Sequence, residues 1–497
     1  MFKNFPGYKV LEKIQKNKSH KRERKLPLNA IKLIFIVAIT SVIALLPTES
    51  FGIEGLTVVH QRIISLFVFA ALMWLTEAMP SWVTSMIVVT IMLLTVSTSA
   101  FNFLRPEDGA GLVPFKSIMA CFANPTIMLF IGGFVLAIGL TKVKLDVALA
   151  RVLLKPFGTR SEIVLLGFIL VTAIFSAFVS NTATAAMMLA FLTPVLRSLP
   201  ADGKGRIALA LAIPVGANLG GMITPIGTPP NMIALDYLSS QGMGISFVDW
   251  TIKMAPFVIV LLLLSWLLLR ILFPFKQKHI KIEIEGDIKW NRHTWSVVAA
   301  FVITIFMWMF GTDLWGVDTN VVAMIPIAIF CATGILTRRD LEEINWSVLW
   351  MVAGGFALGV ALNYKDASSE SLSSLIVNTV PFDNFSPLVV MILAGVICFG
   401  FSNFISHSAA TSLLVPVLGV IAGGLGASLD NFGGPQAMLV GIAIASSVSM
   451  ILPISTPPNA IAHSTGFIEQ KDMMKVGIII GLLGLVLGYA MLIFIGF

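Results

Sequence analysis

Long apolar runs, separated by short polar stretches, follow one another along almost the whole chain. Nine runs are long enough to cross a membrane as helices, because a bilayer core about 30 Å thick needs roughly 20 helical residues. They cover residues 31–47, 58–78, 81–98, 120–140, 250–273, 294–311, 319–336, 345–363 and 476–496. Two further runs, 207–238 and 435–462, are each interrupted by the sequence Thr-Pro-Pro-Asn. The pattern predicts an all-α polytopic membrane protein.

Two other apolar stretches, 162–195 and 384–417, have an unusual length. Each has roughly 34 residues, which is too short for two full spans of about 20 residues. Each carries a Ser-Asn pair near its middle, beginning at Ser180 in the first and at Ser402 in the second. Arms of about 15 residues are roughly 22 Å long as helices. We therefore expect two re-entrant hairpins whose tips reach the middle of the membrane.

The same ordered motifs occur twice along the chain. Gly-Gly-Phe at 132–134 recurs at 354–356, an offset of 222 residues, and the two Ser-Asn pairs have the same offset. Thr-Pro-Pro-Asn at 228–231 recurs at 456–459, an offset of 228 residues. Paired repeats interrupted by Gly and Pro in an apolar chain are typical of a transporter binding site. The sequence therefore predicts two structural repeats, each with a hairpin and a broken helix.

The composition agrees with a membrane protein. Hydrophobic residues make up 57% of the chain and charged residues 12%, and the mean hydropathy is +0.92. A soluble protein of 497 residues needs more polar surface than this. The net charge of +7 does not indicate nucleic-acid binding, because the basic residues lie in loops and near the N-terminus. The three cysteines show neither a disulfide pattern nor metal-ligand spacing.

Loop charges indicate how the chain is threaded. Residues 141–161 hold five basic residues and one acidic residue, and 196–206 hold three and one, so both flanks of the first hairpin are basic. Residues 363–383 hold one basic and three acidic residues, and 418–432 hold one acidic residue. Because basic loops stay in the cytoplasm, the two hairpins enter from opposite faces, as an inverted repeat requires. About eleven spans result, with the N-terminus cytoplasmic and the C-terminus outside the cell membrane.

This threading predicts an organisation in seven segments. They are a basic cytoplasmic tail (1–30), first scaffold helices (31–140), a basic interfacial helix (141–161), a first transport hairpin and broken helix (162–240), second scaffold helices (250–363) with a cytoplasmic linker (276–292), a second transport hairpin and broken helix (384–465), and a final helix (476–496).

The paired motifs have a chemistry that suits charged ligands. Backbone groups at a hairpin tip leave the helix, and lipid cannot satisfy them. Ser180 suits the N-cap of the second arm, and the free N–H groups of that helix start favour an anion. The side-chain oxygen of Asn181 and nearby carbonyls suit a hard cation such as Na⁺. The Pro pairs break their helices and expose the hydroxyls of Thr228 and Thr456 at the same depth.

These motifs resemble those of the divalent anion/sodium symporter family, whose members carry dicarboxylates, citrate or sulfate. The resemblance covers roughly residues 60–495 and rests on Ser-Asn-Thr-Ala-Thr-Ala-Ala at 180–186, Gly-Thr-Pro-Pro-Asn at 227–231 and Thr-Glu-Ala-Met-Pro at 76–80. It implies a homodimer in which a transport domain moves against a scaffold in an elevator motion. It implies dicarboxylate anions and the lipid bilayer as partners, without nucleic acid.

The resemblance also implies which residues form the site. It assigns substrate contacts to Ser180, Asn181, Thr182, Thr228, Pro229, Ser402, Asn403, Thr456 and Pro457. It places one Na⁺ at Ser176, Ser180 and Asn181.

The second half departs from the family pattern. Phe404 follows Ser402-Asn403 where Thr is expected, Cys398 stands where a hydroxyl would mirror Ser176, and His407 stands one turn into the second arm. These changes argue against a second Na⁺ site around Asn403. We therefore favour an exchanger of C4 or C5 dicarboxylates (succinate, malate, fumarate or 2-oxoglutarate) that needs no cofactor.

Other functions are left as alternatives. The first is a Na⁺-coupled dicarboxylate or citrate symporter, and a more remote one is a transporter of an inorganic anion such as sulfate. An enzyme is not expected. Ser406 and Ser408 flank His407, and adjacent residues on a helix point in different directions, so they cannot form a nucleophile–base pair.

Overall fold

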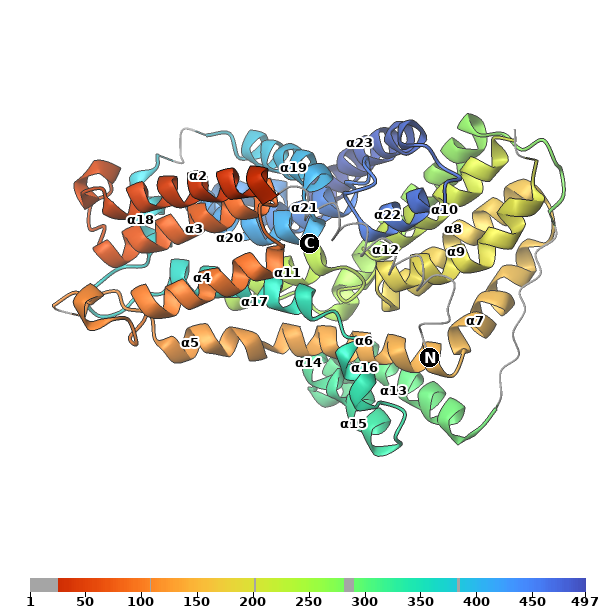
Figure 1. Cartoon of the computed structure of the whole chain (residues 1–497), viewed down its shortest axis with the longest axis horizontal. Helices are drawn as coiled ribbons and strands as arrows, with labels where there is room; N and C mark the ends of the chain where they lie inside the picture. Colours follow the sequence, from red (N-terminus) through yellow and green to blue (C-terminus); the bar gives the residue numbers. More distant parts are fainter. Residues whose placement is uncertain (1–25, 108, 201–202, 281–289, 382–384) are drawn as a thin grey trace.

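The protein is described by a computed structural model over residues 26–107, 109–200, 203–280, 290–381 and 385–497. Within these ranges the regular structure is helical, with two isolated β-bridges in addition (Figure 1). This confirms the predicted all-α fold. Most of the predicted basic tail, and residues 281–289 of the predicted linker, lie outside the described residues.

The helices follow the predicted apolar runs closely. The first half of the chain contains α2 (Leu26–Leu45), α3 (Val58–Thr76), α4 (Ser81–Thr95), α5 (Phe115–Ala120), α6 (Pro125–Lys142), α7 (Leu145–Leu154), α8 (Ser161–Phe178), α9 (Asn181–Ser198), α10 (Gly205–Gly220) and α11 (Pro229–Ser240). The second half contains α12 (Phe247–Leu272), α13 (Arg292–Trp315), α14 (Thr319–Val322), α15 (Met324–Ala332), α16 (Arg338–Glu342), α17 (Trp346–Asn363), α18 (Leu372–Thr379), α19 (Pro387–Phe404), α20 (His407–Leu425), α21 (Gly434–Ser447), α22 (Pro457–Ser464) and α23 (Gln470–Phe494).

Length and composition identify which of these helices can cross a membrane. Nine helical stretches among the described residues meet both requirements, and they include the hairpin arms α8, α19 and α20. Five shorter apolar helical stretches accompany them, among them α4, α10 and α21. The figure of eleven spans stays a prediction.

Both hairpins are present, and a serine caps the second arm of each. The chain leaves the helix between α8 and α9, where the Ser180 hydroxyl accepts a hydrogen bond from the Ala183 N–H. It does so again between α19 and α20, where the Ser406 hydroxyl accepts one from the Ala409 N–H. A helix broken at a Pro-Pro pair follows each hairpin, as α10 and α11 in the first half and as α21 and α22 in the second.

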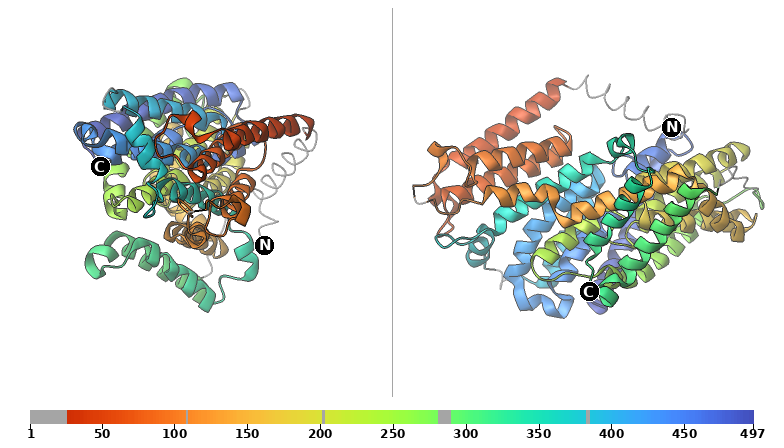
Figure 2. Two further views of the ribbon diagram at one scale, coloured as in Figure 1. Left: turned by 90° about the vertical axis from the view of Figure 1, so that its left-hand side faces the viewer. Right: turned by 90° about the horizontal axis from the view of Figure 1, so that it is seen from below.

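The helices group into two bundles (Figures 1 and 2). In the first, which we call the hairpin bundle, α8 packs on α10, α9 on α22, and α11 on both α20 and α21, and α12 and α23 pack on this group. In the second, the flanking bundle, α2 packs on α3, α3 on α4, and α4 on α17, while α13, α14 and α15 pack on α6. The sequence placed α12 with the second scaffold helices, whereas its contacts include α8, α10 and α23.

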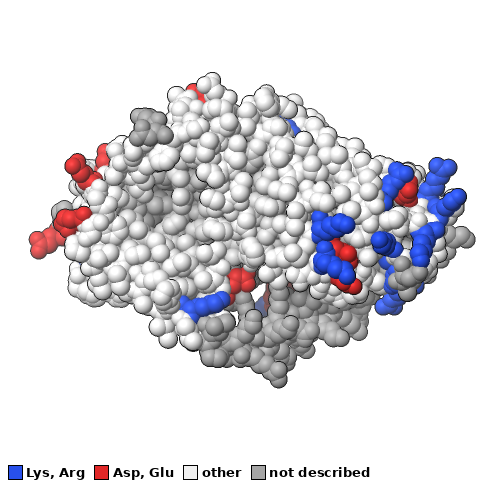
Figure 3. Space-filling model, turned by 90° about the horizontal axis from the view of Figure 1, so that it is seen from above, with Lys and Arg blue, Asp and Glu red and all other residues white. Residues whose placement is uncertain are grey.

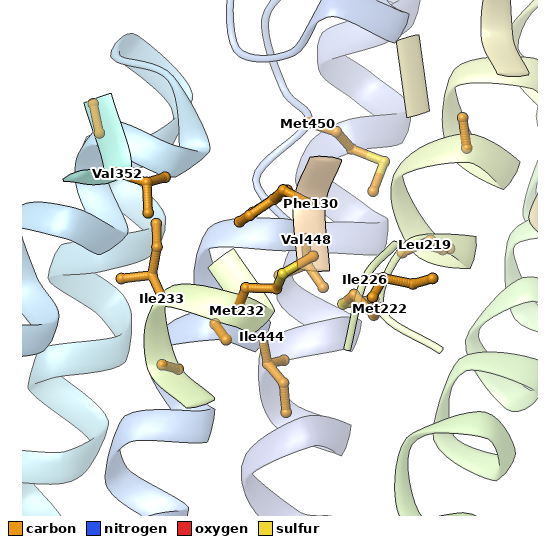
Figure 4. Close-up of a cluster of buried hydrophobic side chains, with 14 of the residues drawn as sticks. Phe130, Leu219, Met222, Ile226, Met232, Ile233, Val352, Ile444, Val448 and Met450 are labelled. Atoms are coloured by element: carbon orange, nitrogen blue, oxygen red, sulfur yellow. The ribbon is translucent and has the colours of Figure 1, made fainter. Parts of the chain in front are cut away.

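Buried apolar side chains fill the space around the two helix breaks. Figure 4 shows Phe130 of α6 beside Ile226 and Met232 of the first broken helix, with Met222 and Met450 nearby. All five are less than a tenth exposed. Within a membrane such packing stabilises through dispersion and close fit, because lipid tails are as apolar as these side chains. The unwound segments are thus embedded in protein, as non-helical backbone at membrane depth must be.

Charged residues lie at opposite ends of the long axis (Figure 3). One end carries exposed basic residues from the α7–α8 turn, the α9–α10 loop and the segment after α12, which are Lys155, Arg160, Lys204, Lys276 and Lys278. The other end carries exposed acidic residues from the loops after α2 and before α5 and α18, which are Glu49, Glu54, Glu107 and Glu370. Between them lies a broad uncharged surface of membrane type. Which end faces the cytoplasm stays a prediction.

Candidate substrate site at four helix N-termini

A cavity of about 360 Å³ lies where the two hairpin tips meet the two broken helices. Four helices begin at this cavity, namely α9, α20, α11 and α22, and their N-cap residues Ser180, Ser406, Thr228 and Thr456 all line it. Each helix start offers unpaired N–H groups and the positive end of the helix dipole. The described residues that line the cavity include no Lys, Arg, Asp or Glu. The field in the cavity therefore comes from backbone and neutral side chains, and it favours an anion.

An oxygen cluster lies behind the first hairpin tip. Asn181 Oδ1 lies 2.6 Å from Ser176 Oγ, and Ser176 Oγ donates a hydrogen bond to Ala217 O at 2.7 Å. One hydroxyl proton cannot serve both oxygens. With the amide turned over, Asn181 Nδ2 donates to Ser176 Oγ (2.6 Å), Gly227 O (3.0 Å) and Ala217 O (3.3 Å). The amide nitrogen thus satisfies these acceptors without an ion, while the four oxygens together form a donor set that suits Na⁺.

Most of the predicted site residues meet in this cavity. Its lining includes Ser180, Asn181, Thr182, Thr228, Pro229, Thr456 and Pro457. Ser176, the predicted cation ligand, is fully buried behind the tip, in contact with Asn181. The roles of these residues stay predictions, but their common location agrees with them.

Ser402 and Asn403 lie elsewhere. They belong to the last turn of α19, and the second arm begins at His407 with Ser406 as its N-cap. Asn403 Oδ1 accepts a hydrogen bond from Ile451 N at 2.9 Å, and its Nδ2 donates to Phe399 O at 2.7 Å. Asn403 therefore supports the unwound segment between α21 and α22. The prediction that Ser402-Asn403 begins the second arm is wrong by one helical turn.

The counterpart of Ser180-Asn181-Thr182 is Ser406-His407-Ser408, at an offset of 226 residues. The sequence comparison relied on prolines. Pro194 lies 14 residues after the first cap, but Pro416 lies only 10 residues after the second. Aligning the prolines therefore moved the second tip back by four residues. The offset of 228 between the two Thr-Pro-Pro-Asn motifs was the signal that could have corrected this.

The corrected register changes three interpretations. Ser402 is the counterpart of Ser176, so this hydroxyl is retained in the second half. Cys398 is buried one turn before Ser402 and does not stand in the place of Ser176. Phe404 is the last residue of α19 and is 65% exposed, so it does not replace a site threonine. Of the departures seen in the sequence, only His407 lies in the cavity.

His407 takes the place of Asn181 in the second half. Its side chain is buried, and its Nε2 lies 2.6 Å from Ser449 O, so the ring nitrogen donates a proton to this carbonyl. Ser402 Oγ donates to Ser446 Oγ at 3.3 Å, away from the imidazole. The second tip thus presents an N–H donor to its carbonyl, where the first tip has an amide that can turn its oxygen inward.

Sequence reasoning missed Asn218 as a site residue. It lies on α10, lines the cavity, and its Nδ2 donates to Thr456 Oγ1 at 3.2 Å and to Asn459 Oδ1 at 3.1 Å. These bonds join the first repeat to the broken helix of the second. An amide in the last turn of an otherwise apolar helix was the available signal.

The flanking bundle closes the cavity with largely apolar side chains. The starts of α4 and α17 and the middle of α6 supply Trp82, Phe130, Phe134, Val348 and Met351. Trp82 packs edge-on against Trp350 of α17, with ring centroids 5.7 Å apart. The polar groups of the site therefore come mainly from the hairpin bundle.

Residues 28–496 match the family described as the sodium:sulfate symporter transmembrane region. The chain belongs to the sodium:sulfate symporter family. This family member is 31% identical to an uncharacterized transporter of Haemophilus influenzae over 469 residues, covering 91% of this chain and 94% of the relative. It is 27% identical to the sodium-dependent dicarboxylate transporter SdcS of Staphylococcus aureus (strain USA300), covering 96% and 94%.

A solved structure supports the fold of this family member. The YdaH transporter of Alcanivorax borkumensis superposes with a TM-score of 0.54 over 86% of this chain and 97% of that chain, at 14% sequence identity. At this identity the likeness concerns the fold alone. Family and fold together confirm the predicted resemblance and establish a membrane transporter.

Proposed function

We propose that this symporter-family member is a secondary transporter of C4 and C5 dicarboxylates, such as succinate, malate, fumarate and 2-oxoglutarate. The observation that carries the proposal is the meeting of four helix N-termini, two from each repeat, at one cavity without charged side chains. A dicarboxylate places one anionic group at each pair of N-termini, whereas a compact anion such as sulfate cannot reach both. The sodium-dependent dicarboxylate transporters among its relatives support the same substrate class.

Each repeat would bind one carboxylate. In the first, Asn181 and the α9 and α11 N-termini supply hydrogen-bond donors, with the hydroxyls of Ser180, Thr182 and Thr228. In the second, Ser406, His407 and Ser408 lie at the α20 N-terminus, opposite Thr456 at the start of α22. Hydrogen bonds to a charged group are stronger than neutral ones, at about 1.5–3 kcal/mol each.

For the coupling mode, we favour Na⁺-coupled symport through the oxygen cluster around Asn181. Exchange was predicted because the second half seemed to lack hydroxyls at Cys398 and Phe404, but neither residue occupies a tip position. The first cluster keeps four oxygens, and the similar SdcS proteins are sodium-dependent. Exchange stays a second candidate, and His407 favours it because its N–H donates where an oxygen ligand would be needed.

We further propose that the hairpin bundle carries the site past the flanking bundle in an elevator motion, within a homodimer. The division of labour in the site supports this movement, since the polar groups lie on the hairpin bundle and the flanking bundle adds mainly an apolar wall. The homodimer rests on the family resemblance.

Uptake into proteoliposomes tests the substrate and the register together. We expect labelled succinate to enter, with competition by malate, fumarate and 2-oxoglutarate and weak competition by sulfate. Asn181→Ala and His407→Ala should raise the succinate concentration for half-maximal uptake tenfold or more, because each removes a donor to a carboxylate. Asn403→Ala should change protein stability more than this concentration. Sulfate uptake without succinate uptake would overturn the proposal.

A further inference from the structure

A second and larger cavity, of about 1070 Å³, lies farther along the same two helices of the flanking bundle. The substrate cavity is lined by residues of α6 within 130–134 and of α17 within 348–351. The second cavity is lined by residues of α6 within 125–129 and of α17 within 355–363. Met232 of α11 lines both cavities. The two spaces therefore follow one another along α6 and α17, on the side that faces the hairpin bundle.

The Gly-Gly-Phe motifs of the two repeats lie between these spaces. A Cβ at Gly132 would overlap the backbone at the α14–α15 junction, and one at Gly354 would overlap a serine of α4. These first glycines hold the flanking bundle together. The second glycines face the other way: Gly133 lines the substrate cavity with open space, and Gly355 lies against α20 of the hairpin bundle.

One turn farther along α17, Gly359 continues this side-chain-free face. It lines the second cavity, and a Cβ there would meet nothing within 4 Å. Small residues on facing helices allow their backbones to approach and to pass closely in a membrane. The face formed by Gly133, Gly355 and Gly359 is therefore smooth from one cavity to the next.

A hydrogen-bonded carboxylate spans the second cavity. Asp236 belongs to α11 of the hairpin bundle, and its Oδ1 accepts a hydrogen bond from Thr126 Oγ1 of α6 at 2.8 Å. The Asn124 side chain at the start of α6 is a further partner of this carboxylate, and the adjacent Tyr237 bonds to Asn363 at the end of α17. An ionisable side chain at membrane depth is costly and usually functional. Here it ties the two bundles together.

We propose that the second cavity is the space into which the site moves along the glycine face, and that the Asp236 hydrogen bonds hold the hairpin bundle in its present position. This inference rests on the transport movement in the proposed function. Breaking the bonds of Asp236 would release the bundle toward the second position. Filling the space at Gly359 would prevent its arrival there.

The latch is tested by the populations of the two positions. In a chain with Cys121, Cys331 and Cys398 replaced by alanine, spin labels on Ser239→Cys of α11 and Asp313→Cys of α13 report the distance between the bundles by double electron–electron resonance. Asp236→Ala should raise the ratio of the second distance population to the present one about tenfold or more, because charge-assisted bonds are lost.

Asp318→Ala is the matched control for the latch. Asp318 also lines the second cavity, but its carboxylate accepts a hydrogen bond from Asn320 N at 2.8 Å, within its own bundle. Its loss should leave the population ratio unchanged. An Asp236→Ala ratio equal to that of Asp318→Ala would overturn the latch, and thermal melting of each variant shows that it is folded.

The path is tested by Gly359→Leu, which has an opposite effect. The present position has room for this side chain, so succinate binding should persist, while the second distance population disappears and uptake falls at least tenfold. Gly423→Leu on α20 is the control, because that glycine also has open space and lies outside both cavities. Uptake by Gly359→Leu at the parent rate would overturn the path. The distance measurements need no substrate, so a parent that fails to carry dicarboxylates refutes the proposed function and leaves this inference standing.

Discussion

Replacing Ser176 by alanine separates cation binding from substrate binding. Ser176 is fully buried and does not line the cavity, but its Oγ lies 2.6 Å from the Asn181 amide and donates to Ala217 O. If Na⁺ binds in this oxygen cluster, Ser176→Ala removes one of four oxygen ligands. The residues that face the substrate are unchanged.

The magnitude follows from what each partner keeps. Ala217 O still accepts a hydrogen bond from Gly221 N at 3.2 Å, so the substitution leaves no orphaned carbonyl. The loss is then that of one neutral polar contact, about 0.5–1.5 kcal/mol. Since 1.4 kcal/mol corresponds to tenfold, we expect the Na⁺ concentration for half-maximal uptake to rise about three- to tenfold. The succinate affinity at saturating Na⁺ should stay the same.

The assay is labelled succinate uptake into proteoliposomes over a series of Na⁺ concentrations, with choline as the replacement. Ser402→Ala is the matched control, because Ser402 occupies the equivalent position in the second repeat, where His407 replaces the amide. It should leave the Na⁺ dependence unchanged. Equal shifts in the two variants would refute the asymmetry between the repeats. A parent whose flux is indifferent to Na⁺ and stimulated by dicarboxylate on the opposite side would refute the symport hypothesis and favour exchange.

Three further predictions concern topology and stability. Cysteines placed near Lys204 should react with impermeant reagents from the cytoplasm and those near Asp430 from outside; labelling of both from one side would exclude the inverted repeat. Asn403→Ala should lower the free energy of unfolding by about 1–3 kcal/mol, because the Ile451 N–H loses its acceptor, and thermal melting measures this. Burial raises the pKa of Asp146 in the interfacial helix α7 to about 6, so its contribution to stability is present below about pH 4 and is lost as the pH rises through 6. Asp146→Asn should therefore stabilise the protein at pH 8, by up to about 3 kcal/mol, and leave it unchanged at pH 4; equal melting shifts at both values would contradict this.

The sequence predicted the repeated architecture well, because its signals are local. Pro-Pro pairs break helices wherever they occur, and serine caps them, so α11, α22 and the first hairpin tip follow from the residues themselves. The second tip did not follow. Ser402 and Ser406 can both cap a helix, and the choice is made by contacts from a distant segment, such as that of Asn403 with Ile451.

The functional residues that sequence reasoning missed are also set by tertiary structure. Asn218 gains its importance from Thr456 and Asn459, which lie 238 and 241 residues away in the chain. Asp236 lies close to Thr126 only because two bundles meet there. Single residues of this kind carry no recognisable spacing, so the fold is needed to connect them.

The replacement of an amide by an imidazole at the second tip gives the cavity a head and a tail. Succinate and fumarate look the same from either end, and they can enter in two orientations that differ only in which tip receives which carboxylate. Malate and 2-oxoglutarate carry a substituent beside one carboxylate, so their two orientations place it next to Asn181 or next to His407. The two enantiomers of malate therefore meet different surroundings, and a repeat that began as a near copy can become the origin of stereochemical choice.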